Sequence, residues 1–378
     1  MSISEDFSLL FNNSPDLVSA APGRVNLIGE HVDYNQGLVL PFAIDSVTNC
    51  ALRLRNDAKI LISSKQLNSG IYETKSSDLV PKTGPEWTRY ILGVLWSLGI
   101  DRGVEILVDS EVPQGAGLSS SAALECSVAL ALNEALQLGL SRIDLARLAQ
   151  RAENDFVGVP CGIMDQTISL LGKAGHAILL DCRDLSSQLI PVNFEANGLR
   201  LLIIDTQAHH ALVDGGYAER RAQCESVSGI FGLDSLRDLS RERLAARGSE
   251  LDSKLYSRAW HVVTEIERVK SAVSSLQSND FASFGELLND SHKSLRDDYE
   301  VSCPELDCAV EISQESGVLG ARMVGGGFGG SAIALVKDGD MGLIASSVER
   351  GFAKAGFKSP RFFDAVPSDG ARLIDRRN

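Results

Sequence analysis

Hydrophobic and polar residues alternate along some segments of the chain and recur at helical spacing along others. Residues 103–113 carry apolar side chains at every second position, which predicts a half-buried strand. Residues 86–100 carry them three and four positions apart, which predicts a helix that ends at Gly99. Residues 37–55 are strand-like with a proline that marks a break or an edge, and the apolar run at residues 199–206 predicts a buried strand.

A loop rich in glycine and serine follows the first of these strands. The stretch Val112 to Glu125 reads VPQGAGLSSSAALE, and the apolar residues at its end and beyond fall at helical spacing, so a helix follows the loop. A second helix is predicted to begin near Ser141, because SRID is a capping-box pattern, and to run towards Glu153 and stop before residues 157–160. Strand, loop and helix therefore succeed one another directly.

The second half of the chain shows mainly helical patterns. Residues 217–245 and 254–278 look helical and charged. Residues 318–339 are predicted to form a strand or the end of a helix, then a glycine turn and a second strand. Composition gives only weak evidence for a domain boundary, near residues 190–198.

Composition and charge narrow the classes of function. The 378 residues are 44% hydrophobic and 23% charged, which is typical of a globular protein with two ordinary domains. The net charge is −14 and no large Lys/Arg cluster occurs, which argues against nucleic-acid binding, so an anionic substrate needs a local positive charge. No apolar run approaches membrane-spanning length, and the start MSISEDFSLLF does not resemble a secretory signal. Seven cysteines without a C-x-x-C pair fit reduced thiols in a cytoplasmic protein.

The glycine and serine loop has the composition of a phosphate cradle. Glycines let the backbone approach a ligand closely, and the first turn of the following helix leaves N–H groups that attract anions. Serine hydroxyls add donors and are suited to face a metal ion. The loop residues are Gly115, Ala116, Gly117, Leu118, Ser119, Ser120 and Ser121.

Other interpretations of this loop fit less well. It lacks the lysine of the commonest nucleotide-binding loop. A dinucleotide fingerprint needs a glycine where Ser120 stands and an acid on a second strand, whereas Asp144 opens another helix. A helix cap needs only one serine. Three serines behind two glycines therefore favour a phosphate site over a plain cap.

Two further segments and a glycine run have chemistry that the pattern alone leaves open. Residues 21–41 contain polar side chains that suit sugar hydroxyls, although a solvated turn explains them at least as well. In residues 153–172, Asp165 is either a general base or an acid at a helix start. The run Gly325 to Gly330 is either a tight turn or a close approach to a ligand. The candidate residues of the first segment, 21–41, are Arg24, Glu30, His31, Asp33 and Tyr34.

Six short motifs, taken together and in order, resemble the GHMP small-molecule kinase superfamily and, within it, the galactokinase family. GRVNLIGEHVDYNQGLVLP is similar to the galactokinase signature, and PQGAGLSSSAALE is similar to the superfamily's phosphate-loop motif. CGIMDQ and GGYAERRAQCE resemble the segments that carry the catalytic acid and a substrate-contacting tyrosine. MVGGGFGG and VPSDGA resemble the third superfamily motif and the C-terminal end.

The resemblance implies an α+β protein with the two-lobed GHMP kinase fold and an active site in the cleft between the lobes. The N-terminal lobe, similar to domain 2 of ribosomal protein S5, would span residues 1–195 and the C-terminal lobe residues 196–366. Residues 367–378 would return to the first lobe. The implied activity is ATP-dependent phosphorylation of D-galactose at its anomeric hydroxyl, giving α-D-galactose 1-phosphate, in galactose catabolism by the Leloir pathway. The implied form is a cytoplasmic monomer that binds neither nucleic acid nor membrane.

Position by position, the resemblance assigns roles to the candidate residues. Asp165 would be the general base, and Arg24 would keep it ionised and stabilise the transition state. Gly115 to Ser121 would hold the ATP phosphates, and Ser121 and Glu153 would bind Mg²⁺. The implied sugar-binding residues are Glu30, His31, Asp33, Gly162 and Tyr217.

The chain departs from the family pattern at a few positions. Val32 stands where threonine is common, and we expect this change to remove a hydroxyl beside the sugar-binding residues. Val324 and Ser331 replace the usual threonine and cysteine around the glycine run. A kinase for N-acetylgalactosamine or arabinose, or a non-catalytic sensor of galactose and ATP, are the alternatives. The sensor is disfavoured because Asp165 and Arg24 are both present.

Overall fold

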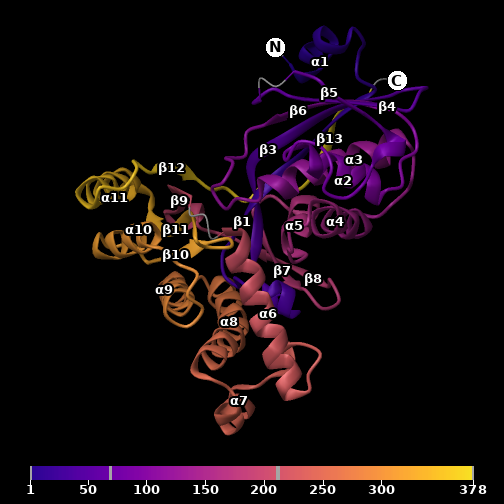
Figure 1. The fold of residues 1–378 in the computed structure, drawn as a ribbon. Helices are drawn as coiled ribbons and strands as arrows, with labels where there is room; N and C mark the ends of the chain where they lie inside the picture. Colours follow the sequence, from indigo (N-terminus) through magenta and orange to yellow (C-terminus); the bar gives the residue numbers. More distant parts are fainter. Residues whose placement is uncertain (1, 68–69, 210–212, 377–378) are drawn as a thin grey trace.

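Three β-sheets and the helices packed on them form the molecule, with the six-stranded sheet at one end and the helix α7 (Arg241–Arg247) at the other (Figure 1). A computed structural model of the protein describes residues 2–67, 70–209 and 213–376. The chain passes from the three-stranded sheet into the four-stranded sheet between Pro191 and Leu199.

The largest sheet has six strands in the order β13-β1-β3-β6-β4-β5, and all neighbours are antiparallel except β4 and β6. Its strands are β1 (Leu17–Asn26), β3 (Pro41–Leu54), β4 (Lys59–Ser64), β5 (Tyr72–Lys75), β6 (Val104–Ser110) and β13 (Arg372–Arg376). The strand predicted at residues 103–113 is confirmed as β6. Because β13 pairs with β1, the last described residues return to this sheet (Figure 1).

Helices cover both faces of this sheet, so β1 is buried along its whole length. Leu17 belongs to the main core, on which α3 and α5 pack. The next residue, Val18, faces the other way and packs with Phe7 and Phe11 of α1, because successive side chains of a strand alternate. The helices of this half are α1 (Ile3–Phe11), α2 (Thr88–Ser97), α3 (Ser120–Ala135), α4 (Arg142–Arg151) and α5 (Met164–Leu171).

The two smaller sheets are entirely antiparallel. The four-stranded sheet has the order β10-β11-β9-β12, with β9 (Leu199–His209), β10 (Gly320–Val324), β11 (Gly329–Lys337) and β12 (Arg361–Asp364). The three-stranded sheet has the order β2-β7-β8, with β2 (Leu38–Val39), β7 (His176–Asp181) and β8 (Ser187–Pro191). The remaining helices are α6 (Val213–Phe231), α7 (Arg241–Arg247), α8 (Ser253–Gln277), α9 (Phe281–Asp297), α10 (Pro304–Glu315) and α11 (Met341–Ala355).

The predicted helical stretch at residues 217–245 is interrupted in the structure. α6 ends at Phe231, and α7 begins only at Arg241. Gly232 follows α6 with φ 62°, the left-handed conformation that commonly ends a helix. The charged pattern therefore predicted helix correctly on both sides and missed the turn between them.

The helix predicted from Ser141 begins with the expected capping box, in which Ser141 and Asp144 bond reciprocally. Beyond α4 the chain continues as a π-helical turn, Ala152–Val157, so the helical path ends close to the stop predicted before residues 157–160. The N–H of Gly158 bonds to the carbonyl of Glu153, five residues back, which is the bond that defines such a turn. Glu153 therefore lies on a widened turn, which turns its side chain inward.

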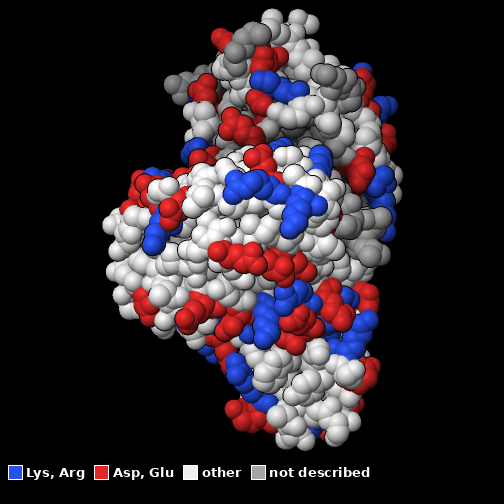
Figure 2. All heavy atoms as spheres, turned by 90° about the vertical axis from the view of Figure 1, so that its left-hand side faces the viewer, with Lys and Arg blue, Asp and Glu red and all other residues white. Residues whose placement is uncertain are grey.

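Charged side chains of both signs are interspersed on the surface. Figure 2 shows one face, on which the described Lys and Arg residues form no continuous patch. Within the described ranges, no helix combines the length and the apolar character that a membrane span requires. All seven cysteines lie in the described part of the chain, and each is a free thiol.

Two glycines let α9 pack closely on β10. A Cβ on Gly285 would lie 2.2 Å from the carbonyl oxygen of Leu319, and one on Gly320 would lie 2.1 Å from the carbonyl oxygen of Gly285. Backbone atoms cannot yield to such contacts without movement of a whole element. This approach sets the position of the strand that leads into the glycine run.

We predict that Gly285→Ala lowers the free energy of unfolding by about 1–3 kcal/mol, the usual effect of overpacking. Urea denaturation measures this change. Gly229→Ala is the control, because Gly229 lies on α6 with nothing outside its own helix within 4 Å of its Cβ position. Alanine there should be neutral or stabilising by up to about 1 kcal/mol. Equal destabilisation by both changes would contradict the close approach.

Candidate functional site

An arginine on the first strand of the chain clamps an aspartate at the start of a helix. Arg24 lies on β1, and Asp165 lies in the first turn of α5. Arg24 Nε donates to Asp165 Oδ1 and Arg24 Nη2 donates to Oδ2, both at 2.8 Å. The third nitrogen, Nη1, donates to the carbonyl oxygen of Gly117 at 2.7 Å. One guanidinium therefore joins β1, α5 and the glycine and serine loop.

The two partners differ in their access to solvent. The Arg24 side chain is 6% exposed, whereas that of Asp165 is 28% exposed. Burial alone would lower the pKa of Arg24, but the negative charges of Asp165 and Glu30 outweigh burial and raise it. Arg24 is therefore a permanent cation, and Asp165 keeps an open edge.

Ser119 occupies the N-cap position of α3 without capping the helix. Its backbone is left-handed, with φ 59°, and its side chain makes no capping bond. The hydroxyl instead donates to Asp165 Oδ2 at 2.5 Å. The alternative that the serines only cap the helix is therefore wrong for Ser119. The first N–H groups of α3 receive no bond from this side chain, which leaves a helix end suited to an anion.

The loop is held against the glycine run by close backbone contacts. Gly117 has φ 72°, and a Cβ on it would lie 3.1 Å from the carbonyl oxygen of Val324. Ser331 Oγ donates to the carbonyl oxygen of Ala116 at 2.7 Å. The structure thus brings together the loop and the glycine run, which lie far apart in the sequence.

A cavity of about 180 Å³ lies beside the Arg24–Asp165 pair. It is smaller than the roughly 300–1,000 Å³ typical of sites for drug-sized ligands, so it suits a small molecule. All five residues predicted to bind sugar line it, namely Glu30, His31, Asp33, Gly162 and Tyr217. The other lining residues are Arg24, Val159, Pro160, Cys161, Met164, Asp165, Gly325 and Gly326.

Hydrogen bonds fix the protonation of His31. Its Nε2 lies 3.1 Å from the carbonyl oxygen of Gly326, which only accepts, so Nε2 carries the proton. Nδ1 then accepts from Tyr34 Oη at 2.9 Å, and Tyr34 accepts from Tyr299 Oη at 2.8 Å. Burial lowers the pKa of His31 to about 3, and the ring is neutral at neutral pH.

Asp33 reaches the cavity because residue 162 lacks a side chain. A Cβ on Gly162 would lie 1.7 Å from Asp33 Oδ2. Burial, followed by the negative charges of Asp165 and Glu30, raises the pKa of Asp33 to about 7. The cavity therefore contains a carboxyl group that changes charge near neutral pH.

Tyr217 and Val32 differ sharply in position. The ring of Tyr217, on α6, lies 5.3 Å from the rings of His31 and Tyr34 and closes one wall of the cavity. Val32 is fully buried in the hydrophobic core and does not line the cavity. The expectation that Val32 removes a hydroxyl beside the sugar-binding residues is therefore wrong, because its side chain points into the core.

A larger cavity, of about 680 Å³, borders the same loop through Gly115, Ser120 and Ser121. Two half-buried aromatic residues at the start of α2, Trp87 and Tyr90, line it. Sequence reasoning missed both, because an aromatic pair three residues apart also fits an ordinary helix core. Its remaining lining residues are Ser64, Gln66, Leu67, Glu86, Val108, Ser110, Gln114 and Leu124.

Buried carboxylates gather at the first turns of α3 and at the π-helical turn. Gln166 Nε2 donates to Glu153 Oε2 at 2.7 Å and to Glu125 Oε2 at 3.4 Å. Burial, then the charge of Asp165, raises the pKa of Glu153 to about 7, while a hydrogen bond with Ser121 opposes the rise. Glu125, which sequence reasoning missed, has a carboxylate oxygen without a partner among the described residues.

Comparison with known proteins identifies the family that shares these features. Residues 5–54 match the galactokinase galactose-binding signature, residues 89–173 the GHMP kinases N terminal domain, and residues 272–354 the GHMP kinases C terminal domain. The galactokinase of Streptomyces coelicolor is 48% identical over 378 residues, which covers 98% of each chain. The chain belongs to the galactokinase family of GHMP kinases.

Further relatives agree with this membership. Human galactokinase is 43% identical, with 86% of this chain and 85% of that protein covered. The structure of Lactococcus lactis galactokinase complexed with galactose matches with a TM-score of 0.94 and 36% identity, over 98% of both chains. A mevalonate kinase, at 20% identity and a TM-score of 0.65 over 94% of this chain and 99% of that one, shares the fold. The predicted GHMP kinase fold is confirmed.

The raised pKa of Asp33 predicts a pH-dependent stability. In the unfolded chain its pKa is about 4, so between pH 4 and 7 the folded state alone keeps the proton. The stability that this carboxyl contributes is therefore complete below about pH 4 and lost as pH rises through about 7. Asp33→Asn removes the titration, and we predict that it raises Tm more at pH 8 than at pH 5, by about 2–4 °C. The exposed Asp234→Asn is the control, and a pH-independent effect of Asp33→Asn would contradict the prediction.

Proposed function

We propose that the protein transfers the γ-phosphoryl group of ATP to the anomeric hydroxyl of D-galactose, giving α-D-galactose 1-phosphate and ADP. The observation that carries this proposal is the Arg24–Asp165 pair, which borders the small polar cavity and contacts Gly117 of the loop. The relatives named galactokinase, one of them solved in complex with galactose, support the choice of sugar.

The small cavity is proposed to hold the sugar. Glu30 and Asp33 supply carboxylate oxygens that accept from hydroxyl groups, and Tyr217 supplies an aromatic wall. Gly162 leaves room for Asp33 and for a ligand close to its own backbone. Both ring nitrogens of His31 are already bonded within the protein, so we assign to it the shape of the cavity wall.

Asp165 is proposed to be the general base. Its open edge would accept the proton of the anomeric hydroxyl as that oxygen attacks the γ-phosphorus and the bond to ADP breaks. Arg24 holds both carboxylate oxygens, which orients Asp165, and Ser119 adds a third donor. Arg24 also places a positive charge beside the loop, where negative charge develops during transfer.

The loop and the larger cavity are proposed to bind ATP. The residues from Gly115 to Ser121 would place backbone N–H groups and the start of α3 against the phosphates. The larger cavity adjoins this loop, and Trp87 and Tyr90 provide aromatic faces for the nucleotide base. The loop borders the larger cavity and contacts Arg24 and Asp165 of the small one, which supports placing phosphoryl transfer beside it.

The residues at Glu153 fit a magnesium ion. Two buried carboxylates and the Ser121 hydroxyl meet there, and one oxygen of Glu125 has no partner among the described residues. Ser121 and Glu153 would hold Mg²⁺, which would neutralise charge on the ATP phosphates. Within the described residues no group of three or more His, Cys, Asp or Glu is arranged so that it could hold a metal ion by itself, so phosphate oxygens and water would complete the coordination.

We also propose the domain division expected from the family, with lobes at residues 1–195 and 196–366 and a return of residues 367–378. The pairing of β13 with β1 supports the return. A cytoplasmic monomer is proposed as the working form, and seven free thiols are consistent with a reducing compartment.

A panel of sugars tests the proposed substrate. With ATP and Mg²⁺, we expect turnover of galactose and a product that carries its phosphate at the anomeric carbon, as assigned by phosphorus-coupled NMR. N-acetylgalactosamine and arabinose are the informative competitors, because they differ from galactose in the groups that the sugar ring carries. Turnover of a competitor with a higher kcat/KM than galactose would replace the sugar but keep the reaction class.

Asp165→Asn tests the proposed base. We expect a fall in kcat of about 10²–10⁴-fold, the usual contribution of general acid–base catalysis, with galactose binding largely kept. Steady-state kinetics and calorimetry with galactose measure the two effects separately. Asp155→Asn, on the exposed side of the π-helical turn, is the matched control. Near-normal turnover of Asp165→Asn would remove Asp165 from its role.

A further inference from the structure

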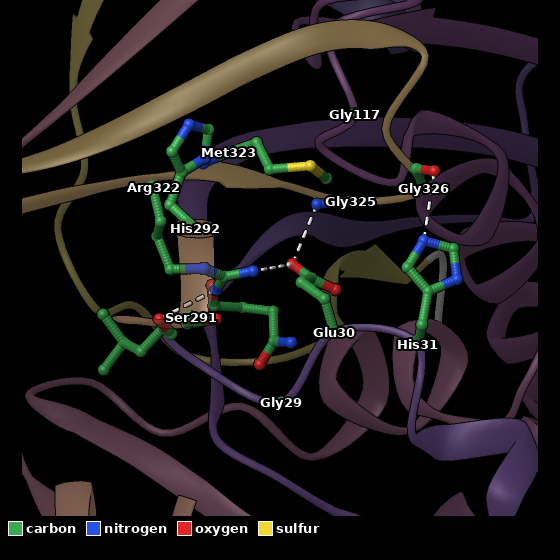
Figure 3. Close-up of polar contacts among 12 residues, drawn as sticks. Gly29, Glu30, His31, Gly117, Ser291, His292, Arg322, Met323, Gly325 and Gly326 are labelled. Carbon is green, nitrogen blue, oxygen red and sulfur yellow. Dashed lines mark hydrogen bonds and ion pairs between the residues drawn. The ribbon is translucent and has the colours of Figure 1, made fainter. Parts of the chain in front are cut away.

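A second buried arginine enters the site from the other half of the chain. Arg322 lies on β10 and its side chain is fully buried. Its Nη1 donates to the carbonyl oxygens of Asn26 at 3.0 Å and Leu27 at 2.9 Å, at the end of β1. Its Nη2 lies 3.1 Å from Glu30 Oε1, as Figure 3 shows. Arg322 thus connects β10 to the segment that leads into the small cavity.

The Glu30 carboxylate is held by one of its two oxygens. Oε1 receives the contact from Arg322 and also the N–H of Gly325 at 2.8 Å. Both donors come from β10 and the residue just after it, and the dashed lines that mark these two contacts in Figure 3 end on the same oxygen. Glu30 lines the small cavity, so the second oxygen, Oε2, is the one left for a ligand.

The backbone of Glu30 is fixed by different groups. Glu265 Oε1 accepts the N–H of Gly29 at 2.9 Å and the N–H of Glu30 at 3.3 Å. His261 Nε2 lies 3.1 Å from the carbonyl oxygen of Glu30. The main chain at Gly29 and Glu30 is therefore held by groups other than Arg322, whose own main-chain contacts are with Asn26 and Leu27.

The geometry points to Arg322 as a positioning residue that presents Glu30 Oε2 to the sugar. This inference rests on the proposed function, because it gives a role to a carboxylate assigned there to sugar binding. Stability alone explains Arg322 poorly, since neither its Nε nor its Nη2 has a hydrogen-bond partner among the described residues, so Nη2 meets Glu30 as an ion pair, and a buried ion pair rarely outperforms apolar packing. Orientation explains why a cation stands here, because its charge holds Oε1 at the position where the Gly325 N–H also donates to that oxygen.

Two substitutions of Arg322 test the inference. Arg322→Met keeps an apolar stem and removes every donor, and we expect the Kd and KM for galactose to rise about 10–100-fold. The KM for ATP should change less than about threefold, because Glu30 does not line the larger cavity, which is proposed to hold the nucleotide. Arg322→Lys keeps one charged donor and should recover part of the loss, even if Arg322→Met folds poorly. Equal effects on galactose and ATP would overturn the inference.

A double-mutant cycle separates this inference from the proposed function. If Arg322 acts through Glu30, the variant carrying both Arg322→Met and Glu30→Gln should bind galactose no more weakly than Glu30→Gln alone. Additive losses would overturn the inference. If Glu30→Gln by itself leaves galactose binding unchanged, both the inference and the assignment of Glu30 to the sugar site fall. If Glu30→Gln weakens binding and neither Arg322 variant does, the inference alone falls.

Arg55→Met is the matched control for loss of a cation from a buried carboxylate. Arg55 pairs with Glu105, which is 3% exposed on β6 and lines neither cavity. We expect this variant to lower Tm without changing the Kd for galactose. Circular dichroism on all variants checks that they are folded, and a change in galactose affinity in Arg55→Met equal to that in Arg322→Met would overturn the inference.

Discussion

Arg24 holds the Asp165 carboxylate with two nitrogens and the carbonyl oxygen of Gly117 with the third. The small cavity, the loop and the start of α5 take their relative positions from this one buried guanidinium. Close backbone contacts complete the arrangement, because Gly117 packs on Val324 and a Cβ on Gly325 would lie 3.0 Å from the Gly117 carbonyl. A side chain at either glycine would separate the segments that the arginine joins.

The site carries more negative than positive charge, and this shapes both stability and chemistry. Burial raises the pKa values of Asp33 and Glu153 to about 7, so the free protein holds carboxyl groups under electrostatic strain. Sugar hydroxyls would donate hydrogen bonds to Asp33, and a cation would neutralise the charge of Glu153. Bound ligands would therefore reduce the unfavourable free energy of these buried carboxyl groups. The same buried carboxyl groups that would bind the ligands therefore lower the stability of the ligand-free protein. Such a trade-off between stability and function is common at functional sites.

Local features of this protein could be predicted from the sequence because they depend on residues a few positions apart. The capping box at Ser141 and the alternation along residues 103–113 needed no knowledge of the fold. The glycine and serine loop was found as a strand-to-helix connection for the same reason. The motifs also carried the family, and with it the set of residues that line the small cavity.

Only the tertiary structure decided which of these side chains meet. Ser119 sits where a helix cap belongs, yet its hydroxyl bonds to Asp165, which arrives from another helix. Val32 lies between polar neighbours in the sequence but points into the core. Trp87 and Arg322 carry no local signal that places them near the loop or Glu30. By itself the sequence determined the elements and the family, whereas contacts between distant segments, which no local pattern encodes, determined the surroundings of each functional group.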